Sequence, residues 1–580
     1  MIKSAFIFKI HLRNLSTNDG DKSMKINRIN PVIFIVICLF SNFSLSQNYA
    51  DVLYKNATIW TGNVSQPSAE AIALKDKKIL AVGNFNTLKN LRGPKTKVID
   101  LNNHFLMPGF IDNHVHFFEG GAALASVDLR NANSKHDFST RIKNYAQKSA
   151  KGKWILNGNW DHENWGGTLP NKSWIDQDTQ NNPVFVIRLD GHMALANSAA
   201  LKLAGITKQT KPPKGGQIIL DNNGELTGIL KGNALNLILS IIPPPSEQEV
   251  LTSFQLAQSH ALSVGLTKVF AMTANETETT MLSDFQLAKA KGIMKIRAYV
   301  YTPIEHWRNL ENLVKTQGKG DELLSWGGVK GFVDGSLGAS TAWFYQPYTN
   351  NPNTQGAPLT EPAKLTTLIN SANTAGLRIA IHAIGDQAID KLISNYELLA
   401  GNDITDLRLR IEHFQHPNQA AINRISQHKI IASAQPYHAV DDGRWAEESI
   451  GNKRIKTTYA FKSILDSKAI LSFGSDWPVA PLSPLAGIYA AVTRRTTDNA
   501  NPDGWLPEQK ITVEQALKAY TFANAYAGFE EDIVGTLEKG KRADMVVLSH
   551  DPRAVLPEEL LNIKVLNTII AGEVVYTADK

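Results

Sequence analysis

The sequence predicts an α/β protein: a (β/α)8 barrel, or TIM barrel, with an inserted subdomain after its first strand and a small composite β-sandwich domain from both termini. Through the middle of the 580-residue chain, short apolar segments alternate with helix-like stretches, the pattern of βα units around a parallel sheet. About 150 residues separate the first two of these segments, far more than a barrel loop needs. Both ends of the chain are rich in strand-forming segments, so we expect them to build one domain together.

Residues 1–47 are expected to be a leader. The basic segment 24–28 precedes the apolar segment 31–43, and Ser44-Leu45-Ser46 offers a small-x-small cleavage site, the arrangement of a secretory signal peptide. Met24 is the expected start of translation. The apolar segment is shorter than the ~20 residues that a membrane span needs. We therefore predict an exported protein, periplasmic or secreted, with no membrane span in the mature chain. The alternative is an uncleaved N-terminal segment that anchors the protein.

Composition excludes several classes of protein. Hydrophobic residues make up 43% of the chain and charged residues 20%, which is a globular balance. The leader holds six basic and two acidic residues, so the remainder carries +2 of the net charge of +6. A body this close to neutral predicts no nucleic-acid partner. The single cysteine, Cys38, excludes both an intrachain disulfide and a cysteine-built metal site, so any metal must be held by His, Asp, Glu or modified Lys.

The composite β-sandwich is predicted over residues 48–108 and 533–580. Its expected strands are 51–61, 71–74, 78–83, 97–100, 543–548, 565–570 and 573–576. The barrel is predicted over residues 109–532, with an insertion at about 118–260. Its eight expected strands are 110–115, 266–270, 296–301, 328–333, 378–382, 409–413, 430–435 and 470–476. We assign the insertion's four tryptophans to its own core, the alternative being that one or two lie over the active site. They are Trp154, Trp160, Trp165 and Trp174.

Polar side chains stand at the ends of four of the expected barrel strands. His114 and His116 are two residues apart in a strand and therefore face the same side. His382, His413 and Asp476 each end a later strand. In a barrel the carboxyl ends of the strands share one face, where active sites lie. Each residue alone could be a helix cap or a buried structural group, but four coincidences in strand order argue for one shared site.

Lys330 lies in the middle of the fourth expected strand. A lysine buried there is costly unless it is paired or neutral, and burial lowers the pKa of an amine. A neutral amine can add carbon dioxide and become a carbamate, which is an anionic oxygen ligand. The alternative is an ordinary ion pair with Asp334 or Asp476.

Histidines together with a carboxylate suit zinc or a similar divalent ion. We expect one or two ions per chain; two ions bridged by a carbamate would hold a water between them and lower its pKa to about 7. Asp476 is then placed to take a proton from this bridging water, which becomes hydroxide, and to pass the proton to a leaving group. These groups predict a hydrolase.

Eight short segments carry these residues together with characteristic neighbours. They are 107–117 (MPGFIDNHVHF), 190–201 (DGHMALANSAAL), 329–342 (VKGFVDGSLGASTA), 382–390 (HAIGDQAID), 410–416 (RIEHFQH), 434–438 (AQPYH), 473–479 (FGSDWPV) and 535–548 (GTLEKGKRADMVVL). In combination they resemble the metal-dependent amidohydrolase superfamily and, more narrowly, amidohydrolase family 3, whose characterised members include N-substituted formamide deformylases. The resemblance runs from about residue 51 to the C-terminus.

The resemblance implies a (β/α)8 barrel with a composite β-sandwich. It implies that His114, His116, His382 and His413 are metal ligands, that Lys330 is the carbamate bridge, and that Asp476 is both ligand and general base. Two further histidines are weaker candidates: His192 in the insertion could donate to a substrate carbonyl, and His438 after the seventh strand could do the same or stabilise a developing oxyanion, the alternative for each being a structural role. Two positions depart from the family pattern, because Phe270 and Gly232 stand where relatives often carry acidic residues.

The predicted function is hydrolysis of an amide-type C–N bond in a small molecule by an exported metal enzyme. Ester, lactone or cyclic-amide hydrolysis on the same site is an alternative, since the same groups serve all of these reactions. A non-catalytic binding protein that retains the metal is a second alternative, because a fold does not fix a function. Assembly into a homo-oligomer is left open.

Overall fold

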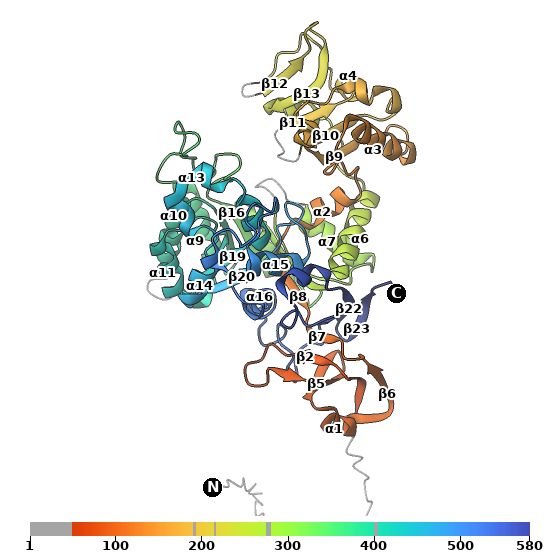
Figure 1. The fold of residues 1–580 in the computed structure, drawn as a ribbon, viewed down its shortest axis with the longest axis vertical. Coiled ribbons are helices and arrows are strands. Elements are labelled where there is room, and N and C mark those ends of the chain that lie inside the picture. The colour runs from red at the N-terminus through yellow and green to blue at the C-terminus, as the bar shows by residue number, and fades with distance from the viewer. Residues whose placement is uncertain (1–48, 189–192, 214–215, 274–279, 400–403, 580) are drawn as a thin grey trace, which may run out of the picture. The chain divides into compact units, whose positions relative to one another are not determined.

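The computed structural model describes residues 49–188, 193–213, 216–273, 280–399 and 404–579 (Figure 1). The predicted leader lies outside the described residues, and so does His192. Within the described ranges, no helix is both long and apolar enough to cross a membrane.

Eight parallel strands form the central sheet, in the order in which they follow one another along the chain (Figure 1). They are β8 (Phe110–Val115), β14 (Leu266–Ala271), β15 (Arg297–Pro303), β16 (Leu324–Phe332), β17 (Arg378–Ala383), β18 (Arg410–His413), β19 (Ile431–Ala434) and β20 (Ile470–Phe473). Each coincides with one of the eight expected segments, which confirms the predicted barrel. Four of these strands, β8, β14, β18 and β19, are buried along their whole length, as strands of a parallel sheet covered by helices are.

The sheet closes where the chain leaving β20 meets the end of β8. Val115 and Trp477 form a parallel bridge, and the Asp476 N–H donates to the His114 carbonyl at 2.8 Å. Gly474 permits this approach: a Cβ there would lie 2.4 Å from Oδ1 of Asn113, closer than atoms can come. The closure therefore brings Asp476 beside the two histidines of the first strand.

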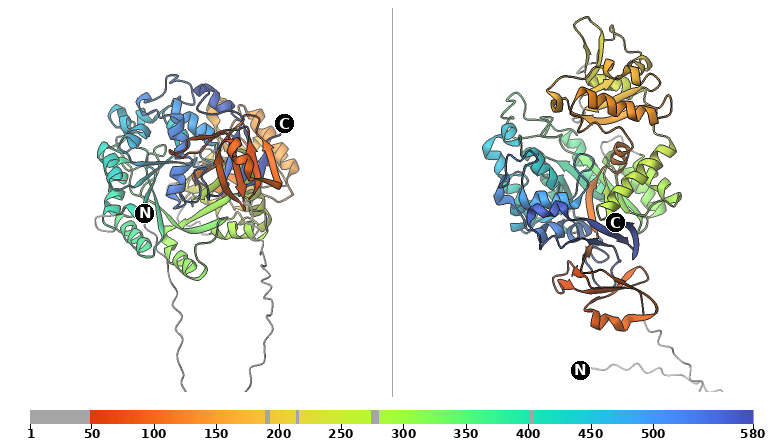
Figure 2. Two further views of the ribbon diagram at one scale, coloured as in Figure 1. Left: turned by 90° about the horizontal axis from the view of Figure 1, so that it is seen from below. Right: turned by 45° about the vertical axis from the view of Figure 1, so that its right-hand side comes forward.

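Helices surround the strands (Figure 2, left). Between consecutive strands run α6 (Glu247–Ser263), α7 (Met281–Ala290), α8 (Trp307–Gln317), α9 (Pro362–Thr374), α10 (Asp386–Glu397), α11 (Gln419–Gln427), α12 (Pro436–Asp442), α13 (Ala446–Arg454) and α14 (Phe461–Asp466). After β20 come α15 (Pro484–Thr493), α16 (Val513–Ala519) and α17 (Phe522–Ala527). Ser246 begins α6 with a reciprocal capping box to Glu249. The largest apolar core lies between the strands and these helices; Phe117, Phe254 and Phe285 pack there ring to ring.

The insertion after β8 contains a five-stranded sheet of its own, in the order β12–β13–β11–β10–β9. Its strands are β9 (Ile155–Trp160), β10 (Val184–Arg188), β11 (Met193–Ala196), β12 (Gly216–Leu220) and β13 (Leu226–Gly232). Its helices are α3 (Lys135–Lys148), α4 (Ser198–Leu203) and α5 (Asn236–Leu239), and α2 (Phe117–Leu124), which precedes them, packs against α6.

Two apolar clusters hold the insertion together. Trp160 is fully buried in one of them and donates its Nε1–H to the Val186 carbonyl at 2.8 Å, while Trp165 and Trp174 pack against the same cluster. Trp154 packs against the other cluster. All four tryptophans therefore serve the insertion's own core, as expected.

Two further sheets form the composite β-sandwich (Figure 2). One contains β5 (Lys78–Gly83), β4 (Ala71–Lys75), β1 (Ala50–Lys55) and β6 (Arg92–Asp100), with α1 (Phe85–Leu88) following β5. The other contains β23 (Glu573–Thr577), β22 (Val565–Ile570), β21 (Met545–Leu548), β7 (Phe105–Pro108), β2 (Thr58–Trp60) and β3 (Ser68–Ala69). The antiparallel pairing of β21 with β7 joins the two ends of the chain in one sheet, which confirms the predicted composite domain.

The sandwich also sets the entry into the barrel. β7 continues into β8 across Gly109, so the strand that carries His114 is anchored in both domains. A buried ion pair between Arg297 of β15 and Asp544, with Nε and Oδ2 2.6 Å apart, holds the barrel and the sandwich together.

Candidate metal centre

The strand-end residues predicted from the sequence lie together at one end of the barrel. His114 is on β8, His116 directly follows that strand, and His413 ends β18. Asp476 lies three residues beyond β20, and His438 lies on α12, which follows β19. All of these except His114 line one cavity of about 760 Å³, together with Lys330 and His382, and His114 is fully buried.

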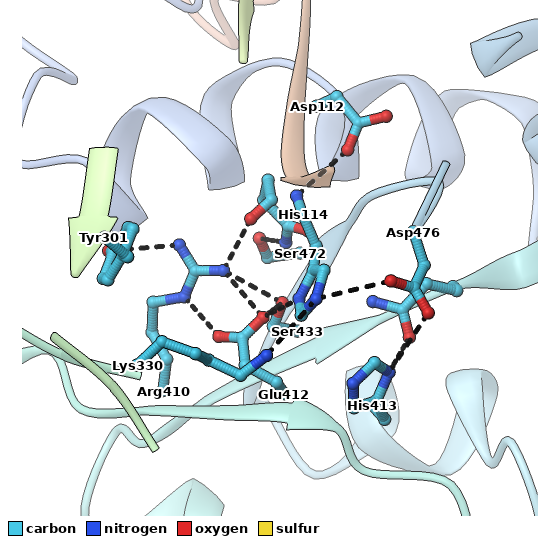
Figure 3. Close-up of polar contacts among 12 residues, drawn as sticks. Asp112, His114, Tyr301, Lys330, Arg410, Glu412, His413, Ser433, Ser472 and Asp476 are labelled. Carbon is cyan, nitrogen blue, oxygen red and sulfur yellow. Dashed lines mark hydrogen bonds and ion pairs between the residues drawn. The ribbon is translucent and has the colours of Figure 1, made fainter. Parts of the chain in front are cut away.

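Asp476 lies among four of these rings. Its Oδ1 is 3.0 Å from Nε2 of His116 and 3.5 Å from Nε2 of His114. Its Oδ2 is 3.7 Å from Nε2 of His438 and 4.0 Å from Nδ1 of His413. The close-up shows Asp476 between His114 on one side and His413 on the other (Figure 3).

Two groups of three side chains bring their ligand atoms to within 4.8 Å of one another. One consists of His114, His116 and Asp476, and the other of His413, His438 and Asp476. Because Asp476 belongs to both groups, its carboxylate could serve two neighbouring ions or complete a single site. Neutral imidazoles and carboxylates are the ligands that zinc and similar ions prefer.

Unsatisfied polar atoms in this region also fit a metal. Nε2 of His438 is buried without a hydrogen bond to any described residue, and the buried Oδ1 of Asp476 is approached by imidazole nitrogens of His116 and His114. Leaving such atoms unpaired costs about 1–3 kcal/mol each. A cation held among them would compensate that cost, so the residues present fit a divalent ion.

A buried carboxylate fixes the orientation of His114. The Nδ1–H of His114 donates to Oε2 of Glu412 at 2.6 Å, which directs Nε2 toward Asp476 (Figure 3). Arg410 holds Glu412 in turn, from Nε at 2.8 Å and from Nη2 at 3.0 Å, and the Ser433 hydroxyl donates to it at 2.7 Å. Coupling a ligating histidine to a carboxylate fixes its tautomer and makes its other nitrogen a better ligand.

Arg410 explains one departure from the family pattern. Its guanidinium lies 5.2 Å from the ring of Phe270 and 5.4 Å from the ring of Tyr301, inside the barrel. An aromatic face attracts a cation. Phe270 therefore packs against Arg410, the residue that holds Glu412.

Two buried carboxylates organise the backbone around the centre. Asp112 accepts from the N–H of His114 and of Ser475, both at 3.0 Å, and so joins β8 to the loop that carries Asp476. Asp334 accepts from three backbone N–H groups at 2.7–3.0 Å, those of Trp343, Ile384 and Gly385. Asp334 thus organises the loops after β16 and β17, a role different from the ion pair considered for it in the sequence.

The backbone is strained where it presents the ligands. His413, Phe414 and Asp476 have φ angles of 73°, 45° and 61°, which side chains other than glycine rarely adopt. Each such residue costs on the order of 1–3 kcal/mol, and strain of this kind collects at functional sites.

Burial keeps several of the imidazoles neutral. Burial and the nearby Lys330 lower the pKa of His114 to about 4 and that of His382 to about 3. Burial alone would raise the pKa of Asp476, but the hydrogen bond from His116 and the electrostatic interaction with the surrounding histidines outweigh it and hold that pKa well below its ordinary value. Neutral rings beside an ionised carboxylate are the protonation states that a cation needs.

Lys330 and His382 lie at the edge of this centre. Lys330 is 1% exposed, and its Nζ is 3.5 Å from Nε2 of His114 and 4.6 Å from the centre of the Phe332 ring. Nε2 of His382 lies 3.0 Å from the Gly335 carbonyl, and its ring centre is 4.5 Å from that of His413. Both residues reach the cavity, but neither belongs to the two convergent groups.

Residues that sequence reasoning missed are those that support the ligands: Glu412, Arg410 and Asp112. One signal was available, because Arg410 and Glu412 are charged residues two apart in an expected barrel strand, and buried charges of opposite sign are usually paired. The partner of that pair, His114, lies 298 positions away and could not be deduced.

Comparisons with known proteins identify the family of this chain. The sequence profile described as "Amidohydrolase family" matches residues 97–576. "Protein LONG AFTER FAR-RED 3" of Arabidopsis thaliana is 40% identical, over 91% of this chain and 92% of its own. "N-substituted formamide deformylase" of Arthrobacter pascens is 28% identical, over 91% and 98%. A crystal structure of an uncharacterized metal-dependent hydrolase from Pyrococcus horikoshii is 28% identical with a TM-score of 0.74, over 87% and 99%.

Proposed function

The chain belongs to the amidohydrolase family, and from this premise we propose that it is an exported enzyme that hydrolyses an amide-type C–N bond in a small molecule. The observation that carries the proposal is the convergence of two groups of ligand atoms on Asp476 at the end of the barrel. The name of the deformylase relative, which denotes cleavage of an amide-type bond, supports the choice of substrate class.

The residues that would hold the metal are His114, His116, His413 and Asp476, with His382 and a carbamate on Lys330 as further ligands of a second ion. A divalent ion bound there, which we propose to be zinc, would polarise the scissile carbonyl and lower the pKa of a bound water to about 7. The rings of His114, His382 and His413 are already neutral, whereas His116, whose pKa is raised, would release a proton on binding the ion.

Asp476 is the proposed general base and acid. Its low pKa keeps it ionised at neutral pH, so it can accept a proton from the attacking water. The same carboxyl group can then give that proton to the departing nitrogen, which completes the cleavage. Its buried position, 6% exposed, keeps bulk water from competing for that proton.

The remaining residues bind and orient. His438 lines the cavity with its Nε2 unsatisfied among the described residues, so it can donate to the substrate's carbonyl oxygen or serve as a ligand. Arg410 and Glu412 hold His114 in one tautomer and one orientation. Substrate enters from the cavity that these residues share.

The test combines metal analysis with a screen of small-molecule amides, esters and lactones, using the wild type and Asp476→Asn. We expect bound divalent metal and turnover of at least one amide by the wild type, and loss of turnover in the variant even when zinc is supplied in excess and held by the remaining histidines. Turnover of esters or lactones alone would move the proposal to those bonds. A metal-containing wild type without any turnover across the panel would favour a binding protein.

Export has a test of its own. Expression of the full chain in a Gram-negative host, followed by mass spectrometry of the N-terminus in the periplasmic fraction, should show a chain that begins near Gln47. An intact N-terminus in the membrane fraction would favour the anchored alternative, and one in the cytoplasm would refute export.

A further inference from the structure

One side of the cavity is formed by α12 and the turn that follows it. Asp441 and Asp442 at the end of α12, and Arg444 and Trp445 in the turn, all line the cavity. The Trp445 N–H donates to the Asp442 carbonyl at 2.9 Å, which fixes the turn and places both side chains on the same wall. We call Asp442 and Trp445 the outer pair.

Charges on the cavity wall outside the metal centre are matched, with one exception. Nη2 of Arg188 lies 2.8 Å from Oδ1 of Asp161, and Nη2 of Arg444 lies 2.6 Å from Oδ1 of Asp441. Asp442 receives only the neutral hydroxyl of Tyr459, at 2.5 Å, from the part of the chain that the structure describes. Arg444, which pairs with Asp441, influences the charge of Asp442 electrostatically, but no ion pair to Asp442 forms among the described residues, so its carboxylate faces the cavity without a directly bound cation.

Such a carboxylate is costly where water is scarce. A partly buried anion lowers its free energy by pairing with a cation or by taking up a proton. Burial raises the pKa of Asp442 to about 6, against the opposing effects of His438 and Tyr459, so the group stays largely ionised at neutral pH. A ligand that supplies the missing positive charge would relieve this cost.

Trp445 adds a second feature that suits the same ligand. Its ring is partly buried beside Gly338, where an added Cβ would lie 3.5 Å from the ring carbon Cη2. Gly338, Asp442 and Trp445 line the same cavity, so the Trp445 ring and the Asp442 carboxylate are both open to one ligand. An aromatic face beside a carboxylate is a favourable place for an ammonium group, particularly one attached to an apolar body.

The outer pair lies close to the reacting centre. His438 and Asp442 are four residues apart on α12, so their Cβ atoms are neighbours about 5–6 Å apart. Nε2 of His438 is itself 3.7 Å from Oδ2 of Asp476. A single small molecule can therefore contact Asp442 while its scissile carbonyl lies at Asp476.

Resting on the hydrolase function proposed above, we infer that the substrate is an amide that carries an ammonium group, or a comparable cationic donor, within a few bonds of the scissile carbonyl, and that Asp442 and Trp445 bind it. Asp442 is the specificity-determining residue: its carboxylate accepts the cationic N–H, and Trp445 covers the adjoining apolar part. No bond is made or broken in this contact.

The test is a binding experiment that needs no turnover. Phenethylamine, which is protonated at neutral pH, and 2-phenylethanol, its neutral counterpart, are titrated calorimetrically into the metal-containing full-length protein. We expect the amine to bind the wild type about tenfold more tightly than the alcohol, since a hydrogen bond to a charged partner is worth about that factor. In Asp442→Asn the amine should lose this advantage, while the affinity of the alcohol changes less than about threefold.

Asn keeps the shape of Asp442 and can still accept from Tyr459, so the variant removes little besides the charge. Glu448→Gln is the matched control: Glu448 is exposed on α13, does not line the cavity, and its loss changes the net charge by the same amount. It should leave the preference for the amine intact.

Three results would overturn the inference. They are equal affinity of the two probes for the wild type, a preference for the amine that survives in Asp442→Asn, and no binding of either probe to the wild type. Because neither probe contains a hydrolysable bond, a protein that binds the amine through Asp442 but turns over no amide would contradict the hydrolase proposal and leave the recognition site intact.

Discussion

The two walls of the cavity are built in different ways. The inner wall consists of His114, His116, His413 and Asp476, which stand at or just beyond strand ends and are held by buried partners such as Glu412. The outer wall consists of Arg188 from the insertion and Asp441, Asp442, Arg444 and Trp445 from α12 and its following turn. The inner wall is built on the strand ends of the barrel, whereas the outer wall is built on a helix end, a turn and the insertion.

The difference indicates where chemistry and selectivity reside. Strands of a closed barrel hold their ends rigidly, so groups that must meet a metal and a water belong there. Loops and insertions vary without disturbing the barrel, so groups that recognise one substrate belong on them. Changes in the inner wall should therefore affect all substrates alike, and changes in the outer wall should affect some more than others.

The largest effect is expected from Asp476→Asn. An amide cannot accept and return the proton, so kcat should fall by about 10²–10⁴ for every substrate that the wild type hydrolyses. Kinetics on two unlike amides measures this. A loss confined to one of them would mean that the inner wall contributes to selectivity, contrary to the comparison.

The next effect is expected from Glu412→Gln. The amide oxygen can still accept from the Nδ1–H of His114 but lacks the negative charge that makes this histidine a better ligand, so metal affinity should fall by about 10–100-fold. Competition with a metal chelator measures affinity without reference to activity. Glu397→Gln, which removes a carboxylate paired with Arg424 outside the barrel, is the control and should bind metal as the wild type does. Unchanged affinity in Glu412→Gln would show that the buried network serves folding alone.

A smaller effect is expected from Trp445→Ala in the outer wall. Loss of the aromatic face should weaken cationic ligands by about tenfold at most, because a cation–π contact is worth roughly 0.5–2 kcal/mol. The metal content should stay the same, since Trp445 lies outside both ligand groups. If Trp445→Ala lost metal to the same extent as Glu412→Gln, the outer wall would contribute to metal binding, contrary to the comparison.

The smallest effect is expected from the protonation of His416, a buried residue close to His413 of the inner wall. His416, three residues after His413, is buried and donates to or accepts from the Thr458 hydroxyl at 2.9 Å. Burial lowers its pKa to about 3, so the folded protein stays neutral there while the unfolded chain takes up a proton below its ordinary pKa of 6.5. Stability should therefore fall as the pH drops from about 6.5 toward 3.

Between pH 6.5 and 5.5 this histidine alone should contribute a loss of about 1 kcal/mol in the free energy of unfolding. Chemical denaturation at the two pH values, in the wild type and in His416→Asn, measures it. The variant should be less stable at neutral pH and less sensitive to acid. Equal acid sensitivity in both proteins would show that His416 is not the responsible group.

Much of the inner wall could be predicted from the sequence, because its residues stand at the ends of apolar strands and a barrel brings such ends together. The eight strands and the composite sandwich follow from the same periodicity. Glu412 could not be matched to His114, because their contact spans 298 positions and depends on strand register. Asp442 and Trp445 carry no signal at all in the sequence, since only the closed cavity shows which loop residues face it. His192 lies outside the described residues, so its predicted role remains a prediction.

Metal content per chain tests the central claim most directly. Elemental analysis of the purified mature protein, with Lys330→Ala beside it, should find divalent metal in the wild type. About two ions per chain, reduced in the variant, would support a carbamate bridge, and about one ion in both would leave a single site in which Lys330 is structural. A wild type that takes up no divalent metal, even when zinc is supplied, would contradict the account of the inner wall as a metal centre.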